Sequence, residues 1–204
     1  MRRLAILTFA LSCLALPASD DCKPAFFDGK TTAGWEGKGE LWRIVDGAIV
    51  GSTEPDGLKG SNTFLCTQKK YRDFEMKCKV RLKDGKGNSG IQIRSEMADP
   101  KGFVVKGPQA DMGQQYWGSL YGEKFGGMMK QSPADKVKAV VKQSDFNDYW
   151  VKVVGKRVTI TINGTVMVDE EFKNLPDEGI IALQLHAGGP MEVTFKNIEF
   201  KEIK

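Results

Sequence analysis

The chain has 204 residues and a formal net charge of +4, and its basic and acidic residues are scattered along its length. This near-neutral balance argues against a nucleic-acid-binding protein, which normally carries a strongly basic patch. A chain of this length fits one domain and can bury about 70% of its unfolded surface without the help of disulfides.

The first 18 residues have the pattern of a secretory signal peptide, with basic Arg2 and Arg3, an apolar run over 4–16 and a small-residue exit at Ala18. We expect cleavage after Ala18, a single domain over residues 19–204 and a secreted or periplasmic location in a bacterium. Cys13 suggests a lipoprotein instead, but the residues before it make a poor lipobox. No later apolar stretch is long enough to span a membrane.

Three cysteines follow the expected cleavage site: Cys22, Cys66 and Cys78. An odd number leaves at least one thiol outside any intrachain disulfide. Cys66 and Cys78 lie on two neighbouring predicted strands and could pair across them. The pattern slightly favours the alternative, in which both are small, buried, apolar residues.

The dominant local pattern is that of β-strands. A hairpin is predicted over 41–51, because Asp46-Gly47 readily supplies the positive φ angles of a tight turn. Residues 74–81 alternate apolar and charged side chains, which is typical of a strand with one face in water.

The C-terminal half contains a predicted three-strand meander over 149–170, with turns at 155–156 and 163–164. Two further strands are predicted over 180–186 and 192–203, and only 132–140 suggests a short helix. Many short strands joined by Gly-rich turns predict an all-β fold, a jelly-roll β-sandwich of two antiparallel sheets.

Several catalytic motifs are missing from the sequence. His186 is the single histidine, which excludes a His-rich zinc site, and there is neither a Gly-x-Ser-x-Gly elbow nor a Walker A motif. Residues 85–90 match Gly-x-Gly-x-x-Gly. Strand-like residues follow them where a dinucleotide-binding motif needs a helix, so they predict a Gly-rich turn.

Strand parity places pairs of polar side chains on shared outer faces, because residues two apart point the same way. Amides and charged groups bond sugar hydroxyls, and aromatic rings stack on the apolar faces of sugars. The pattern therefore indicates a sugar site, although alternation also puts polar groups outward on any half-wet sheet. The residues are Gln92 and Arg94, Gln109 and Asp111, and Gln184 and His186, followed closely along the chain by Tyr116, Trp117 and Tyr121.

An ordered series of sequence blocks resembles the 3-keto-disaccharide hydrolase family. The blocks are Phe26-Phe27-Asp28-Gly29-Lys30-Thr31 with Gly34-Trp35, then 42–47, 71–75, Asn88-Ser89-Gly90-Ile91-Gln92-Ile93-Arg94, 109–111, 118–121, 147–150, 163–164, 179–186 and 195–198. The resemblance implies a concanavalin A-like lectin/glucanase fold and cleavage of glycosides that carry a ketone at sugar carbon 3. Pro108 and Gln109 stand where relatives often have tyrosine and glutamate, which leaves the catalytic base open.

The resemblance implies C2 deprotonation, β-elimination of the C1 substituent and hydration. His186 or Asp111 is the expected base, and Arg94 is the expected stabiliser of the enolate unless a divalent metal takes that role. Tyr121 would serve as an acid or a stacking platform. The expected substrate-binding residues are Gln92, Gln109, Tyr116, Trp117 and Gln184.

Three other functions compete with this interpretation. A non-catalytic, lectin-like carbohydrate-binding module would keep Trp117 and Tyr121 as platforms and would tolerate the loss of His186. An interaction domain of the cell envelope would have no sugar affinity. A classical retaining glycosidase is disfavoured, because the usual strand with paired carboxylates is missing.

Overall fold

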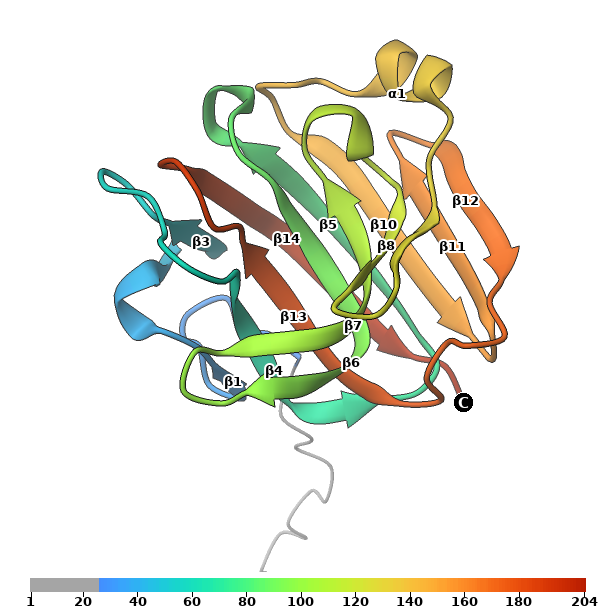
Figure 1. Cartoon of the computed structure of the whole chain (residues 1–204), viewed down its shortest axis with the longest axis horizontal. Coiled ribbons are helices and arrows are strands. Elements are labelled where there is room, and N and C mark those ends of the chain that lie inside the picture. Colours follow the sequence, from blue (N-terminus) through green and yellow to red (C-terminus); the bar gives the residue numbers. More distant parts are fainter. Residues whose placement is uncertain (1–25) are drawn as a thin grey trace, which may run out of the picture.

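The computed structural model describes residues 26–204. The expected signal peptide, Cys13 and Cys22 lie outside this range. Two antiparallel sheets of seven strands each stack face to face, which confirms the predicted all-β jelly-roll sandwich (Figure 1). Within the described residues, no helix is long and apolar enough to cross a membrane.

The first sheet, called sheet A here, carries the site described below. Its central strands β13, β6 and β7 cross the front of the molecule in Figure 1. In spatial order its strands are β1 (Trp35–Glu36), β4 (Thr63–Tyr71), β13 (Gly179–Leu185), β6 (Ser89–Asp99), β7 (Val104–Met112), β8 (Leu120–Glu123) and β9 (Gly127–Lys130).

The second sheet, sheet B, lies behind sheet A in the same view. A single α-helix, α1 (Ala134–Val140), is described, close to the predicted segment, together with the 3-10 turns η1 (Gly39–Leu41), η2 (Lys83–Gly85) and η3 (Gln114–Tyr116). The strands of sheet B are β12 (Thr165–Glu171), β11 (Arg157–Ile162), β10 (Asn147–Val154), β5 (Phe74–Leu82), β14 (Glu192–Glu202), β3 (Ala48–Ser52) and β2 (Trp42–Val45).

The two predicted Asx-Gly hairpins form at the expected residues. Asp46 and Gly47 join β2 to β3 with φ angles of 48° and 76°, and Asn163 and Gly164 join β11 to β12 with 49° and 80°. Consecutive positive φ angles are the signature of the turn that matches the twist of two antiparallel strands. The register of both hairpins is therefore set by local sequence.

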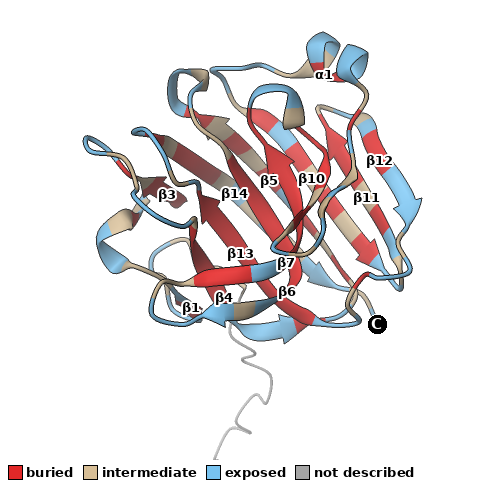
Figure 2. Cartoon of the chain, in the orientation of Figure 1, coloured by how far each residue is buried: buried red, intermediate tan, exposed pale blue. Residues whose placement is uncertain are grey.

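The main core fills the space between the two sheets, where the buried residues concentrate (Figure 2). Val158, Ile160 and Ile162 are fully buried there, as the parity of the meander predicts. Cys66 and Cys78 are free and buried, and they belong to different sheets, so the favoured alternative holds. Burial raises the pKa of both thiols to about 12.

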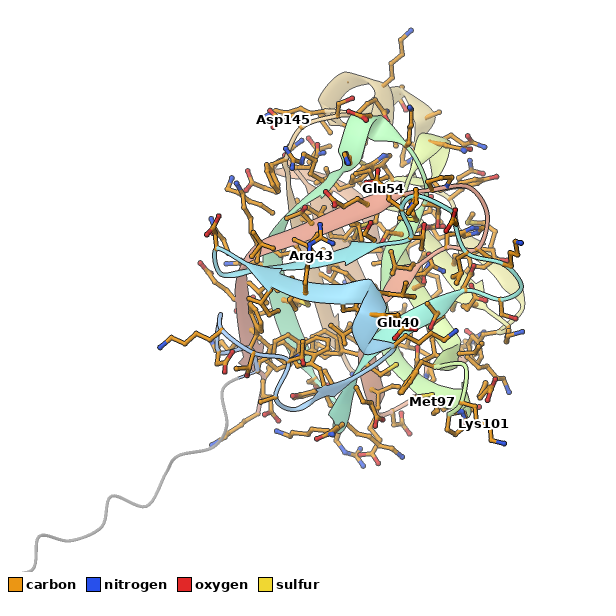
Figure 3. The ribbon with its side chains drawn as sticks, turned by 90° about the vertical axis from the view of Figure 1, so that its left-hand side faces the viewer. Glu40, Arg43, Glu54, Met97, Lys101 and Asp145 are labelled. Carbon is orange, nitrogen blue, oxygen red and sulfur yellow. The ribbon has the colours of Figure 1, made fainter. Side chains whose placement is uncertain are left out.

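The hairpin of β6 and β7 bends over the outer face of sheet A. Its tip bonds to β4, where Phe64 N donates to Phe103 O at 3.0 Å and Thr63 Oγ1 donates to Gly102 O at 2.8 Å. A second apolar cluster is buried on this face, and it comprises Phe64, Cys66, Val105, Ile180 and Ala182, with Met97 packed against it. Met97 and Lys101 mark this hairpin in the side view of Figure 3.

Candidate functional site

A cavity of about 550 Å³ opens on the outer face of sheet A, beside the bent hairpin. Its volume falls within the range of about 300–1,000 Å³ that is typical of small-molecule sites. Strands β7, β8, β9 and β13, together with neighbouring loops and the segments just before β4 and β6, supply its walls. The lining residues are Asn62, Asn88, Gln109, Asp111, Tyr116, Tyr121, Glu123, Met128, Gln131, Gln184 and His186.

Six of the nine residues singled out from the sequence line this one cavity. They are Gln109, Asp111, Tyr116, Tyr121, Gln184 and His186. Strand parity predicted the pairs on β7 and β13 correctly, because both strands are regular where they pass the cavity. Gln109 lies opposite Tyr121, and Gln184 lies opposite Phe64. The other polar lining residues, Asn62, Asn88, Glu123 and Gln131, are not predicted from strand parity, and of these Asn88 alone lies in a sequence block that resembles the family.

Arg94 does not reach the cavity, contrary to the prediction that it shares a face with Gln92. Its φ angle is 46°, and the pairing of β6 with β7 shifts register between Gln92 and Glu96. A left-handed residue at such an irregularity breaks the alternation of side chains. Arg94 donates instead to Asp73 Oδ1 at 2.6 Å and to three backbone carbonyl oxygens, those of Arg72, Gly155 and Pro176.

Trp117 and Gln92 also do not line the cavity, contrary to the prediction that both bind substrate. Trp117 follows the turn η3 and is fully buried in the main core, so it offers no stacking surface. Gln92 is fully buried beneath the cavity and does not line it. Both errors arise because exposure was inferred from polarity or aromatic character without knowledge of the turn and the neighbouring strand.

A chain of three buried amides forms the floor of the site. Gln92 Nε2 donates to Gln109 Oε1 at 2.9 Å, and Gln109 Nε2 donates to Gln184 Oε1 at 3.3 Å. Reversing the Gln92 amide lets it donate to the Pro108 carbonyl at 2.9 Å, in which case Gln109 turns as well. The direction of the chain therefore decides whether the last amide offers a donor or an acceptor to a ligand.

The block Asn88-Ser89-Gly90 builds this floor from strand β6. Ser89 Oγ donates to Gln184 O at 2.7 Å, which fixes β13 against β6. Gly90 pairs with Asp111 on β7, and a Cβ on Gly90 would overlap the Gln109 side chain. The missing side chain therefore leaves the space in which the amides of β7 and β13 meet above β6.

Asp111 is the one buried carboxylate of the cavity and is only 6% exposed. Its Oδ1 accepts hydrogen bonds from Asn88 Nδ2 at 3.1 Å and from Met112 N at 2.9 Å. Burial raises its pKa from the usual 3.8 to about 7, although hydrogen bonds from Asn88, Met112 and Gln109 lower it in part. Its backbone carbonyl accepts the Tyr149 hydroxyl at 2.8 Å, which anchors it to sheet B. A carboxyl group with such a pKa can accept and return a proton near neutral pH.

His186 stands at the rim, just after β13 ends. Its Nδ1 lies 2.6 Å from the carbonyl oxygen of Ala187. Because a carbonyl oxygen only accepts, Nδ1 carries a hydrogen, and Nε2 is the nitrogen that can exchange a proton with a ligand. Two contacts hold the loop: Ala187 N donates to Asn62 Oδ1 at 2.8 Å, and Gly188 pairs with Leu58 in both directions.

The site combines two carboxyl groups, of which the buried Asp111 has the raised pKa, with one imidazole, two phenols and several neutral amides. Across residues 26–204, no three His, Cys, Asp or Glu side chains group as metal ligands. A metal at the cavity would therefore rely on amide or ligand oxygens in addition to the carboxylates of Asp111 and Glu123. The set suits proton transfer on a polyhydroxylated, uncharged ligand.

Comparison with known families identifies the family of this chain. A family described as the 3-keto-alpha-glucoside-1,2-lyase-like domain matches residues 24–201. The chain belongs to this family. A 3-keto-disaccharide hydrolase of Bacteroides thetaiotaomicron is 35% identical over 88 residues, which are 40% of this chain. The match covers only 30% of that longer protein.

Solved structures agree with the concanavalin A-like, lectin-type fold. A protein of Parabacteroides distasonis, named as a candidate glycosyl hydrolase, has a TM-score of 0.64 at 21% identity, with 87% of this chain and 92% of that one covered. The carbohydrate-binding module CBM66 of Bacillus subtilis has a TM-score of 0.59 at 16% identity, covering 83% and 96%. A legume lectin-like domain of Entamoeba histolytica reaches 0.57 at 14% identity, covering 84% and 91%.

Proposed function

We propose that this protein cleaves glycosides whose sugar carries a ketone at C3, by elimination followed by hydration. The observation that carries the proposal is the buried Asp111 carboxyl group, whose pKa is raised by burial to about 7, in a cavity lined by neutral amides. Membership of the family and the glycosidase-like fold support the same chemistry.

In the proposed reaction, Asp111 removes the proton on C2, which the neighbouring ketone acidifies. The electron pair moves into an enolate at C2, C3 and the C3 oxygen. When the ketone re-forms, a C1–C2 double bond is made and the bond from C1 to the leaving oxygen breaks. Water then adds its oxygen to C1, and C2 regains a proton, so the products are the free 3-keto sugar and the released alcohol.

His186 stands at the rim while Asp111 lies on the floor. His186 Nε2 is proposed to give a proton to the leaving oxygen and later to take one from the water that adds to C1, and Asp111 returns its proton to C2. Tyr121 lines the same cavity and would pack against the sugar ring. The amide groups of Gln184 and Asn62 replace Arg94 as hydrogen-bonding groups for the C3 oxygen. Neutral amides stabilise an enolate without lowering the pKa of Asp111 as a cation would.

The first test is turnover of a panel of 3-keto glycosides beside the same unoxidised glycosides, with and without EDTA. Release of the alcohol from the 3-keto compounds alone supports the proposal, and EDTA sensitivity would assign a metal to the reaction. In D₂O, elimination and hydration put deuterium at C2 of the product. A control incubation of that product without protein measures its spontaneous exchange.

The second candidate function is a non-catalytic carbohydrate-binding module. It is favoured by the similarity to CBM66 and to the lectin-like domain. Saturable binding of glycosides without turnover, unchanged in Asp111→Asn, would support the binding module and contradict the enzyme. Export to the periplasm or medium is proposed from the signal-peptide pattern alone, and fractionation of expressing cells with sequencing of the mature N-terminus tests it.

A further inference from the structure

A second cavity, of about 400 Å³, lies on the outer face of sheet B, which points away from the viewer in Figure 1. A row of cross-strand neighbours crosses this face. Their chain neighbours belong to the main core or pack against it, so these side chains point away from sheet A. Four of them line the cavity, and Val166 continues the row. The row consists of Val166 on β12, Thr161 on β11, Trp150 on β10, Lys77 on β5 and Glu199 on β14.

Two polar atoms of this row are buried and have no hydrogen-bond partner within residues 26–204. They are Trp150 Nε1 and Thr161 Oγ1, and the two residues are directly paired across β10 and β11. Thr161 is only 8% exposed. A buried donor or hydroxyl group without a partner costs free energy, so such atoms are rare in folded proteins. A ligand that brings hydroxyl groups to this row supplies the missing partners.

The indole ring of Trp150 gives the cavity an aromatic surface. Trp150 is half-buried and lines the cavity, and Lys77 Nζ lies 5.8 Å from the centre of its ring. Lys77 is exposed and forms no ion pair with another described residue, so its side chain can move aside at little cost. The ring then offers a surface on which the apolar face of a sugar stacks, with the exposed Val166 extending the row.

The charges in the lining of this cavity balance. Lys77 and Lys79 are positive, and Asp148 and Glu199 are negative. Lys79 Nζ lies 2.6 Å from Asp148 Oδ1, so one pair is already neutralised. A balanced lining does not favour an ion of either sign. The carboxylates accept hydrogen bonds, and the lysines and the Asn197 amide donate them. The cavity therefore fits an uncharged ligand that is rich in hydroxyl groups.

We propose that the cavity on sheet B is a separate, non-catalytic site that binds a neutral glycan through Trp150 and Thr161. It lies on the opposite sheet from Asp111, so a glycan bound there leaves the cavity of Asp111 open. The protein can thus be held on a polysaccharide while it acts on another molecule. This inference is independent of the proposed cleavage, because none of the residues that carry it lines the cavity of Asp111.

The test is an NMR titration of the isotope-labelled full chain with cellohexaose, with mannohexaose and, as an anionic counterpart, with an oligogalacturonate. The chain has four tryptophans, and none lines the cavity of Asp111, so the indole N–H signal of Trp150 reports on the cavity of sheet B. Trp150→Phe identifies this signal by its loss. We expect a saturable shift with a neutral hexaose. No shift with either neutral hexaose, or a shift with the anionic sugar alone, would overturn the proposal.

Thr161→Val and Thr159→Val form a matched pair of variants on the same strand and face. Thr161→Val removes the unpartnered hydroxyl, so glycan affinity should fall about 5-fold while the midpoint of urea unfolding does not fall. Thr159 lies outside the cavity, and its Oγ1 donates to Asp169 Oδ1 at 2.9 Å. Thr159→Val should therefore lower the midpoint and leave glycan affinity unchanged. Wild-type affinity in Thr161→Val, or an equal loss of affinity in both variants, would contradict the assignment.

Discussion

Arg94 and Asp111 are two buried charged residues on the neighbouring strands β6 and β7, and their surroundings differ sharply. Arg94 is 2% exposed, faces the carboxylate of Asp73 and donates to three carbonyl oxygens. Asp111 is 6% exposed, its Oδ1 accepts hydrogen bonds from Asn88 and Met112, and it forms no ion pair within residues 26–204.

The contrast distinguishes a buried charge that stabilises the fold from a buried charge that can take part in proton transfer. A buried ion that is paired and fully bonded holds parts of the fold together, because any change leaves its partners unsatisfied. A buried ion without a counterion changes its pKa and becomes able to exchange protons. Burial alone, or a charged residue type alone, does not distinguish the two; the partners do.

The largest expected effect is on turnover in Asp111→Asn. Loss of the base should lower kcat/KM for 3-keto glycosides about 10³-fold, within the usual contribution of a general base. The hydrogen bonds from Asn88 and Met112 reach Oδ1, and the asparagine oxygen can keep them. Steady-state kinetics on the folded variant measure the loss. A decrease below 10-fold would remove Asp111 from the role of base.

The next effect is on folding in Arg94→Met. Removal of the guanidinium leaves Asp73 and three carbonyl oxygens without their donor, so the free energy of unfolding should fall by about 3 kcal/mol. Lys79→Met is the control, because its pair with Asp148 is exposed and should contribute under about 1 kcal/mol. Urea unfolding gives both values. A specific loss of turnover in folded Arg94→Met would return this residue to the active site.

The sequence predicts the site well where strands are regular and poorly where they are not. Gln109 with Asp111, and Gln184 with His186, line the cavity because alternation holds along β7 and the end of β13. Arg94 does not follow the alternation of side chains, because its positive φ angle lies at a register shift that the residue types do not predict.

Other errors concern contacts between distant segments. Asn62 enters the cavity from a loop far from its partners Ala187 and Glu123 in sequence. Trp117 becomes core because η3 turns it inward. Asn88 lies in a sequence block that resembles the family, but its hydrogen bond to Asp111 depends on the pairing of β6 with β7, which a single sequence does not predict.

A smaller effect follows from the raised pKa of Asp111, and it concerns how the free energy of unfolding depends on pH. The pKa is about 7 in the folded state and near the usual 3.8 when unfolded. Between those values the folded protein binds a proton that the unfolded chain has released, so the free energy of unfolding falls as pH rises. In Asp111→Asn the residue cannot ionise, so its side chain causes no such fall in the free energy of unfolding.

The two proteins should therefore be equally stable near pH 4, and the variant should be more stable by about 2–4 kcal/mol at pH 8. Denaturant unfolding at several pH values measures the difference. A constant difference across this range would mean that Asp111 is ionised throughout, as Asp169 is expected to be beside Arg157, whose hydrogen bonds lower the pKa of that carboxyl group.

The smallest effect tests how the environment sets the position of the Asp111 pKa. The hydrogen bond from Asn88 Nδ2 favours the charged carboxylate, so Asn88→Ala should raise its pKa further. Loss of about 1 kcal/mol corresponds to a shift of roughly 0.7 pH unit. The acidic limb of kcat/KM should therefore move from near pH 7 to higher pH. Asn62→Ala is the control, because Asn62 bonds to Glu123 and Ala187 and not to Asp111, so its loss should lower the height of the profile without moving the acidic limb. A change in the height of the profile without this movement would make Asn88 a ligand contact alone, and the proton-accepting group would then have to be sought at His186.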